Sequence, residues 1–486
     1  MKILPVKSTL IISLVVVLII SAVATTQAQT TDVETILKRE MKERDIPGLQ
    51  IAVVQHGKIV LLKSYGFANL QDSVAVNNHS IFAINSCTKA FAGVAIMQLV
   101  EEGKIYLAAP VSNYLDGLPI DWQPVTIKQL LTHISGLPDI INVTSSSTHG
   151  LGDLSEADAW EKVKAMPMQF ETGEQFSYNQ TNYALLAKVI DKVSGKPFVQ
   201  MFKERQFQVV NMPKTSYGDS RDVIPHFAPT YTYRNNIDGQ ALSERKLINN
   251  YAEFPAFLRA GSGLNSTAED MANWIIALQQ GKLLKLKTLN TLWQAGSYNN
   301  GSPTQWALGW GFTKFRKKHK AVGMTGGGRS GFLVYPDDDL AIVVLTNLIG
   351  GTPEDFIEEI AACYNSDIAT YDPMTALRIQ LRKQGFEKAI EVVSEEKKKN
   401  PEFQPGENDL NDWGYRLMSK GQDKEAQEIF KLNIYLYPQS WNTYDSYGEV
   451  LLKNGQKEEG IKMYKKSIEM NPDNQNGKKV LERILK

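Results

Sequence analysis

The chain has 486 residues, enough for two or three domains, and its hydrophobic fraction of 43% is ordinary for a globular protein. Its 53 lysines and arginines equal its 53 aspartates and glutamates in number. Nucleic-acid-binding proteins normally carry a basic excess or patch, so we expect no nucleic-acid partner. With two cysteines and no metal-ligand spacing among histidines and cysteines, we expect no disulfide framework, no metal and no cofactor.

The N-terminal segment has the layout of a secretory signal peptide. Lys2 and Lys7 precede an uncharged apolar run over residues 10–24, and small residues up to Ala28 follow. We predict a signal peptide over residues 1–28. A retained membrane anchor is the alternative, because the run approaches membrane-spanning length. Both alternatives predict an exported chain, periplasmic or extracellular, which is membrane-anchored if the segment stays.

The apolar residues of the next segments are spaced in a way that predicts one helix followed by strands. Residues 32–44 have apolar positions at helical spacing. The runs 49–54 and 58–63 are β-branched and separated by Gln55-His56-Gly57, which predicts a hairpin. Residues 81–84 then lead into a helix that is apolar on most sides and ends near Gly103. Such a helix belongs in a core.

Ser86 and Lys89 stand at the start of that core helix, three residues apart and therefore on one face. A serine hydroxyl becomes nucleophilic when a neighbouring group takes its proton. The same spacing occurs at Ser243/Lys246 and Ser394/Lys397, in polar surroundings typical of a surface. The pair alone leaves two interpretations open, a nucleophile at the floor of a cleft and a helix N-cap.

From about residue 104 to 290 the patterns are mainly helical, with helices expected at 126–131 and from Ser266/Thr267, and a mobile loop at 144–152. Four strand-like runs and a closing helix follow, over residues 308–312, 321–324, 331–335, 340–346 and 354–364. We predict an α/β domain over residues 32–366. Its two ends share an antiparallel sheet flanked by helices, with a helical insert between them.

After Pro373 the chain becomes helical, charged and repetitive. Seven residue pairs keep an offset of 34: Trp413/Tyr447, Gly414/Gly448, Leu417/Leu451, Gly421/Gly455, Ala426/Gly460, Phe430/Tyr464 and Pro438/Pro472. This period resembles the tetratricopeptide repeat, a helix–turn–helix unit, and predicts an all-α repeat domain over residues 374–486. Such a tail serves as a docking surface for a protein partner, or packs on the first domain and stabilises it.

Several motifs occur in one order along residues 45–349. They are Ile46-Pro47-Gly48, Ser86-Cys87-Thr88-Lys89, Leu99 to Lys104, Leu130 to Leu137, Tyr178 to Tyr183, Gly261 to Leu264 and Gly326 to Phe332. Together they resemble the serine β-lactamase and penicillin-binding protein family, in the branch of class C β-lactamases, D-alanyl-D-alanine carboxypeptidases and esterases. The resemblance implies a β-lactamase-like fold and two-step acyl transfer.

The resemblance also implies the roles of the site residues. Ser86 is the expected nucleophile, Lys89 its hydrogen-bonded partner and Tyr178 the base. The backbone N–H groups of Ser86 and Gly327 are the expected oxyanion hole, and Gln180 and Thr325 are the expected substrate contacts. A core or rim tyrosine is the alternative for Tyr178. Two further Tyr-x-Asn sequences, at Tyr233 and Tyr298, lie in surroundings that read as loops.

The chain departs from the family pattern at two positions. Gln180 replaces the asparagine of Tyr-x-Asn, and Met324 stands where the family usually has lysine or histidine. Methionine brings no charge and almost no hydrogen bond, so the expected grip on a substrate carboxylate is weakened. Arg329 could offer another positive charge, but a solvated surface arginine is the preferred interpretation.

The leading hypothesis is an exported serine hydrolase that attacks an ester or amide of a small molecule or peptide, as an esterase, peptidase or β-lactam-reactive protein. The alternative is a catalytically weak protein that binds peptidoglycan or peptide and recruits a partner through its repeats. Met324 and Gln180 favour the alternative, and the ordered motifs favour the hydrolase.

Overall fold

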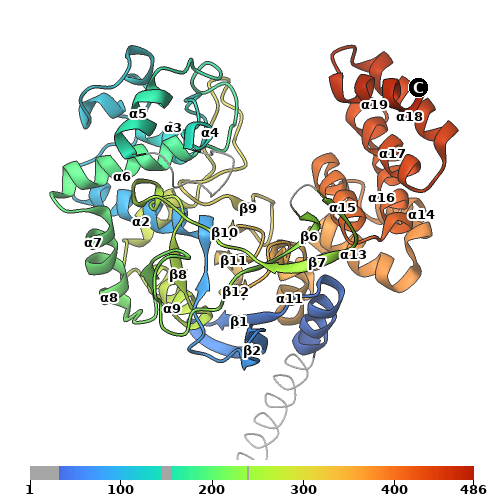
Figure 1. The fold of residues 1–486 in the computed structure, drawn as a ribbon. Coiled ribbons are helices and arrows are strands. Elements are labelled where there is room, and N and C mark those ends of the chain that lie inside the picture. The colour runs from blue at the N-terminus through green and yellow to red at the C-terminus, as the bar shows by residue number, and fades with distance from the viewer. Residues whose placement is uncertain (1–31, 145–154, 238–239, 486) are drawn as a thin grey trace, which may run out of the picture. The chain divides into compact units, whose positions relative to one another are not determined.

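The computed structural model describes residues 32–144, 155–237 and 240–485. The chain divides into two compact units, Met1–Asn365 and Ser366–Lys486 (Figure 1). The predicted signal peptide and nearly all of the loop predicted at 144–152 lie outside the described residues. Their structure is therefore not part of the fold presented below.

The first unit is organised around a seven-stranded antiparallel sheet of order β3-β2-β1-β12-β11-β10-β9 (Figure 1). The strands are β1 (Gly48–Gln55), β2 (Lys58–Asn69), β3 (Val74–Ala75), β9 (Phe312–Lys314), β10 (Ala321–Gly326), β11 (Ser330–Tyr335) and β12 (Leu340–Thr346). β1 pairs with β12, with Leu49 opposite Thr346. The two ends of the unit therefore share one sheet, as the sequence predicts.

Helices cover both faces of this sheet (Figure 1). α9 (Ala268–Gln279) packs against β1 and β12, and α11 (Ile357–Tyr364) packs against β11 and β12. All of β12 is buried, because a strand covered on two faces has no solvated side. Its unbroken run of apolar residues, Leu340 to Leu345, reflects that position. Residues 32–44 form the expected N-terminal helix.

The insert between the two halves of the sheet contains most of the helices. They are α2 (Thr88–Glu101), α3 (Ile127–Leu131), α4 (Ile141–Thr144), α5 (Glu156–Lys164), α6 (Gln180–Ser194), α7 (Phe198–Phe202), α8 (Gln208–Val210) and α10 (Leu286–Leu292). Thr126 caps α3 in a capping box with Gln129, and Thr267 caps α9, close to the two predicted starts. α2 is almost wholly buried in the main hydrophobic core, as expected.

The insert is not purely helical, which corrects the sequence prediction. β6 (Tyr231–Ile237) pairs with β7 (Gln240–Asn249), and β4 (Phe82–Ala83), β8 (Leu264–Ser266) and β5 (Ser216–Tyr217) form a small sheet. Tyr233 therefore lies in a strand and not in a loop. The polar residues Arg234 to Asn236 of β6 are exposed, which conceals the strand from an apolar pattern.

The strand predicted at residues 308–312 is also wrong, because β9 begins only at Phe312. Gly309 has φ +90°, which breaks an extended run, and a Cβ there would lie 2.8 Å from the carbonyl oxygen of Lys89. The apolar residues of this segment therefore pack as a turn against α2.

The second unit is helical in its described residues. It contains α12 (Asp367–Tyr371), α13 (Pro373–Gln384), α14 (Ala389–Lys399), α15 (Glu407–Ser419), α16 (Asp423–Leu436), α17 (Trp441–Lys453), α18 (Lys457–Met470) and α19 (Gln475–Leu485). α15 and α17 begin 34 residues apart, as do α16 and α18. Gly414 faces the ring of Phe430, and Gly448 faces the ring of Tyr464 in the same way. The assignment to tetratricopeptide repeats stays a prediction.

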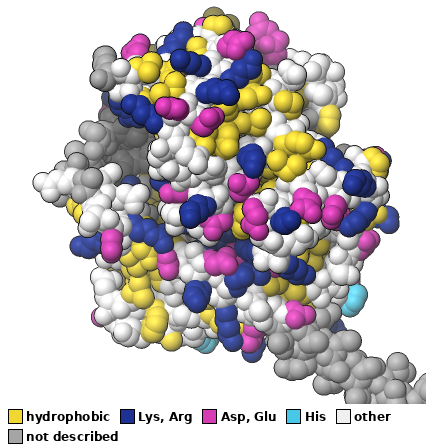
Figure 2. Space-filling view, turned by 90° about the vertical axis from the view of Figure 1, so that its right-hand side faces the viewer, with side chains coloured by type: hydrophobic (Ala, Val, Ile, Leu, Met, Phe, Trp, Pro, Cys, Tyr) yellow, Lys and Arg dark blue, Asp and Glu magenta, His cyan; other side chains and the backbone are white. Residues whose placement is uncertain are grey.

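On the face shown in Figure 2, basic and acidic side chains are interspersed, in keeping with the balanced composition. Among the described residues, no helix combines the length and apolar character that a membrane crossing requires.

Candidate active site

Ser86 lies in a single turn of 3-10 helix, η1 (Asn85–Cys87), directly before α2. Asn85 has φ +46°, a left-handed conformation that asparagine tolerates better than most residues. Cys87 is buried and free, and its thiol donates to the carbonyl oxygen of Met324 at 3.5 Å. Ser86 itself does not cap α2, since Cys87 occupies that position without a side-chain capping bond. The turn is therefore anchored in the core while Ser86 stays half-buried.

Tyr178 reaches this serine directly. Its Oη donates a hydrogen bond to Ser86 Oγ at 2.7 Å. Tyr178 precedes α6, whose start is fixed by the Asn179 side chain, which accepts from the N–H of Asn182. The Tyr178 side chain is 38% exposed, so the pair is accessible from solvent.

Lys89 is the second residue of α2 and is fully buried. Its Nζ donates to Gln180 Oε1 at 3.0 Å and to the Gly261 carbonyl oxygen at 2.8 Å. Nζ also lies 4.7 Å from the ring centre of Tyr178 and 4.9 Å from that of Tyr183. Within the described chain, Lys89 makes no hydrogen bond to Ser86, so the predicted bond between them is absent here. Neutral acceptors and two aromatic faces stabilise this buried ammonium.

Gln180, one of the two departures from the family pattern, is the side-chain partner of Lys89. It is the first residue of α6 and is largely buried. Its backbone N–H donates to Asp139 Oδ1 at 3.0 Å. Burial raises the pKa of the Asp139 carboxyl above its ordinary value. Gln180 thus keeps the amide of the family position and uses its oxygen to accept from the lysine.

The end of β10 brings Gly326 and Gly327 against the serine turn. A Cβ on Gly326 would lie 2.0 Å from the Ile84 carbonyl oxygen and 3.1 Å from the backbone nitrogen of Ser86. Gly327 has φ +59°, a conformation that favours glycine. Ser86 is the second residue of its helix, where the backbone N–H has no intrahelical acceptor. Thr325 is half-buried on the same strand, opposite Gly331.

Met324, the second departure, is a core residue. It is 2% exposed and belongs to the main core. Its Sδ accepts from the Gly311 N–H at 3.3 Å. The position therefore supplies packing and no charge.

His133 was not assigned a role from the sequence, although it lies inside the Leu130 to Leu137 motif. It is fully buried, and its ring centre is 4.7 Å from that of Tyr178 and 4.8 Å from that of Trp306. Its Nδ1 accepts from the Asn179 N–H at 3.1 Å. Burial and, secondly, the charge of Lys89 lower the pKa of His133 well below its ordinary value, so the ring is neutral near pH 7.

Arg329 contradicts the preferred interpretation of a solvated surface residue, because it is only 3% exposed. Its Nε and Nη2 donate to Asn85 Oδ1 at 2.9 and 2.6 Å. Burial lowers the pKa of this guanidinium to about 10. No sequence pattern indicates this position, because its burial depends on segments far apart in the chain.

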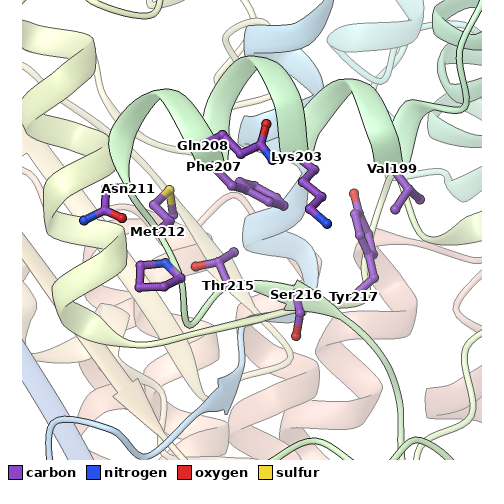
Figure 3. A pocket seen from close by; sticks show the side chains of 10 residues that line it. Val199, Lys203, Phe207, Gln208, Asn211, Met212, Thr215, Ser216 and Tyr217 are labelled. Carbon is purple, nitrogen blue, oxygen red and sulfur yellow. The ribbon is translucent and has the colours of Figure 1, made fainter.

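A separate surface pocket of about 380 Å³ is lined by residues of α7, α8, β5 and the connecting segments (Figure 3). It contains none of the predicted site residues. No group of three or more metal-ligating side chains is found in the described part of the chain.

Comparisons with known proteins relate this chain to one family. The family model described as Beta-lactamase matches residues 33–362. Protein flp of Staphylococcus aureus strain MRSA252 is 27% identical over 329 residues, covering 65% of this chain and 62% of that protein. Penicillin-binding protein 4* of Bacillus subtilis strain 168 is 26% identical over 305 residues, covering 61% of this chain and 67% of that protein.

Solved structures share the fold. D-amino acid amidase from Ochrobactrum anthropi SV3 superposes with a TM-score of 0.60 at 21% identity, over 70% of this chain and 99% of that chain. The octameric penicillin-binding protein homologue from Pyrococcus abyssi gives a TM-score of 0.59 at 22% identity, over 73% and 81%. EstCE1, a hydrolase with promiscuous acyltransferase activity, gives 0.58 at 19%, over 70% and 98%.

Proposed function

Because the chain belongs to the beta-lactamase family of serine hydrolases, we propose that it cleaves an ester or amide through an acyl-enzyme on Ser86. The 2.7 Å hydrogen bond between Tyr178 Oη and Ser86 Oγ is the observation that carries this proposal. The two atoms are within proton-transfer distance without any rearrangement. The sequence prediction of an exported hydrolase, periplasmic or extracellular, is part of the same proposal.

In the proposed acylation step, the Tyr178 hydroxyl, which donates to Ser86 in the structure, first gives its proton to water. Its oxygen then takes the proton of Ser86 as Oγ attacks the substrate carbonyl carbon. The Lys89 ammonium, 4.7 Å from the tyrosine ring centre, stabilises the negative charge on the phenolic oxygen. Tyr178 then gives the proton to the leaving group. In deacylation it takes a proton from water, whose oxygen attacks the acyl carbon, and returns it to Ser86 as the acyl bond breaks.

The oxygen that becomes negatively charged in each tetrahedral intermediate needs donors. The Ser86 and Gly327 N–H groups are the proposed pair, since the glycine turn lies against the serine turn. Loss of one such donor typically costs about 2.7–4 kcal/mol of transition-state stabilisation. Backbone donors are independent of side-chain changes at Met324.

The buried Met324 argues against a substrate gripped through a carboxylate at that position. An efficient β-lactamase or carboxypeptidase of that kind is therefore disfavoured, and an esterase, amidase or peptidase is favoured. EstCE1, a hydrolase with promiscuous acyltransferase activity, and the D-amino acid amidase show that this fold supports acyl-transfer and amide chemistry in other proteins.

A fluorophosphonate probe on the purified protein tests the nucleophile. We expect covalent labelling of the wild type, loss of labelling in Ser86→Ala, and full labelling in the control Ser243→Ala. Ser243 has the same Ser-x-x-Lys spacing but is exposed on β7. Equal labelling of wild type and Ser86→Ala would refute the assignment.

The second candidate is a weakly catalytic protein that binds peptide or peptidoglycan, with the second unit docking a protein partner. It is favoured by the hydrogen bonds of Lys89, which go to Gln180 and Gly261. Hydrolysis of p-nitrophenyl acetate that is lost in Lys89→Ala would exclude a purely binding role.

A further inference from the structure

Arg329 carries a buried positive charge that the proposed reaction does not use. Three per cent of the residue is exposed, and the guanidinium has no carboxylate partner among the described residues. Nε and Nη2 share one acceptor, Asn85 Oδ1, while Nη1 is buried without any partner in the described chain. A buried, unpaired charge is strongly unfavourable, and a native protein that keeps one needs a reason.

Arg329 and Asn85 line a small cavity of about 40 Å³. This space holds a water molecule or one small planar group. Ser220, Thr230 and Ser262 add hydroxyl-bearing residues to its wall. The wall is therefore rich in donors around an unpaired cation.

One carboxylate, Asp219, also lines the cavity, but its charge is compensated. Arg221 Nη2 lies 2.6 Å and Arg259 Nη2 lies 3.0 Å from Asp219 Oδ2. The Phe254 N–H donates to the same oxygen at 2.9 Å. The remaining uncompensated charge at the cavity is that of Arg329.

The cavity adjoins the reaction centre on three sides. Asn85 is covalently linked to Ser86, and a Cβ on Gly327 would lie 3.4 Å from Arg329 Nε. Ser262 and Gly263 directly follow Gly261, whose carbonyl oxygen accepts from Lys89. A group bound in the cavity would thus lie beside residues that adjoin Ser86 and the Lys89 acceptor in the chain.

We propose that Arg329 and Asn85 form a subsite for a carboxylate, so that the acyl portion of the substrate carries a carboxylate group. A guanidinium presents coplanar N–H donors that match the two oxygens of a carboxylate. The β10–β11 turn then supplies the cation that Met324 lacks. This inference rests on the proposed function, since it concerns the substrate of the same serine.

The test compares mono-p-nitrophenyl glutarate with p-nitrophenyl pentanoate, which have acyl chains of equal length with and without a carboxylate. We expect the wild type to prefer the glutarate ester by roughly 10- to 100-fold in kcat/KM. Within each variant the readout is the ratio of kcat/KM for the two esters: Arg329→Met is expected to lose the preference, and Arg329→Lys to recover part of it. Asn85→Asp, which places a carboxylate against Arg329 without removing it, also loses the preference.

The proposal would be overturned if the wild type showed no preference between the two esters. It would also be overturned if kcat/KM fell equally for both esters in Arg329→Met, which would leave Arg329 a structural role. Binding of free glutarate or glutaramide is measured by the shift in Tm. This measurement depends neither on turnover nor on whether Arg329→Met folds. Glutarate is expected to raise Tm of the wild type but not of Asn85→Asp, and glutaramide is expected to raise neither.

Labelling by the fluorophosphonate distinguishes failure of the proposed hydrolase function from failure of the proposed carboxylate subsite. If the wild type is not labelled but the glutarate shift is present and lost in Asn85→Asp, the proposed hydrolase fails and the carboxylate site stands. If labelling occurs and glutarate binds without an ester preference, the site takes a free carboxylate, and the substrate-borne group is refuted.

Discussion

The buried positive charge of Lys89 is stabilised without a carboxylate as a hydrogen-bond partner in the described chain. Lys89 is fully buried, and its described partners are an amide oxygen, a backbone carbonyl and the rings of Tyr178 and Tyr183. A carboxylate partner would hold the ammonium more tightly but would cancel its field at Tyr178. The direct hydrogen-bond acceptors of Lys89 are neutral, and the nearby Asp139 carboxylate acts on it without a hydrogen bond, so the positive charge still acts on the tyrosine.

Removal of the tyrosine hydroxyl tests this arrangement. Tyr178→Phe deletes the group bonded to Ser86 Oγ, so we expect kcat for p-nitrophenyl acetate to fall by roughly 10²- to 10⁴-fold. Steady-state kinetics measure the effect. Tyr106→Phe, at a 67% exposed tyrosine, is the control and should match the wild type. A Tyr178→Phe enzyme of normal kcat would exclude Tyr178 as the base.

The burial of Met324 determines whether a lysine, which the family usually has at this position, can be introduced there. Its side chain lies in the core, so Met324→Lys would bury an unpaired charge and should lower Tm markedly. Met324→Leu, the matched apolar change, should cost less than about 1.5 kcal/mol. Thermal unfolding of the two variants checks this. A Met324→Lys protein as stable as Met324→Leu would show that the side chain can turn out of the core.

His133 predicts a pH dependence of stability. Its pKa is lowered in the folded chain, so below the ordinary value of about 6.5 the unfolded chain binds a proton that the folded chain does not. The stabilisation is complete above about pH 6.5 and is lost as the pH falls below it, by at most about 1.4 kcal/mol per pH unit.

Urea unfolding of wild type and His133→Asn from about pH 8 to about pH 5 measures this effect. Asparagine suits the φ of +58° and can still accept from Asn179. The variant should lose stability less steeply on acidification than the wild type. Parallel curves would mean that His133 does not titrate on unfolding.

Among the elements, α2 is the one whose position the site depends on most, since it carries Lys89 and follows Ser86. It passes the 308–309 turn so closely that a Cβ on Gly93 would lie 2.3 Å from the Leu308 carbonyl oxygen. Close backbone packing of this kind fixes both the depth and the angle of the helix.

We therefore expect Gly93→Ala to destabilise the protein. In an open helix interior the change would stabilise by up to about 1 kcal/mol, but here the contact with backbone must be relieved. We expect a lower Tm together with slower fluorophosphonate labelling, because α2 and the serine turn move with it. A Tm above that of the wild type would show that the turn yields easily.

At the scale of the whole molecule, each unit has its own hydrophobic core. The core of the second unit contains residues such as Leu377, Trp413 and Phe430, and the candidate catalytic residues all belong to the first unit. We expect a chain ending at Asn365 to fold and to hydrolyse small esters like the full chain. Cooperative unfolding and p-nitrophenyl acetate kinetics test this, and loss of folding would show that the second unit stabilises the first.

The sequence by itself determined the features that depend on neighbours along the chain. The β1–β2 hairpin follows from two β-branched runs around His56-Gly57, and the buried α2 follows from its apolar residues. The ordered motifs indicated the family and brought Ser86 and Tyr178 together as candidates. Turn chemistry and periodicity are local, so they can be read without the fold.

Only the tertiary structure decided which groups these residues meet. Gln180 takes the hydrogen bond of Lys89, His133 supports Tyr178, and Arg329 is buried against Asn85, 244 residues away. A charged residue in a glycine turn has no local pattern that predicts burial. Its environment is set by distant segments that pack around it, and that is why its burial against Asn85 becomes visible only in the fold.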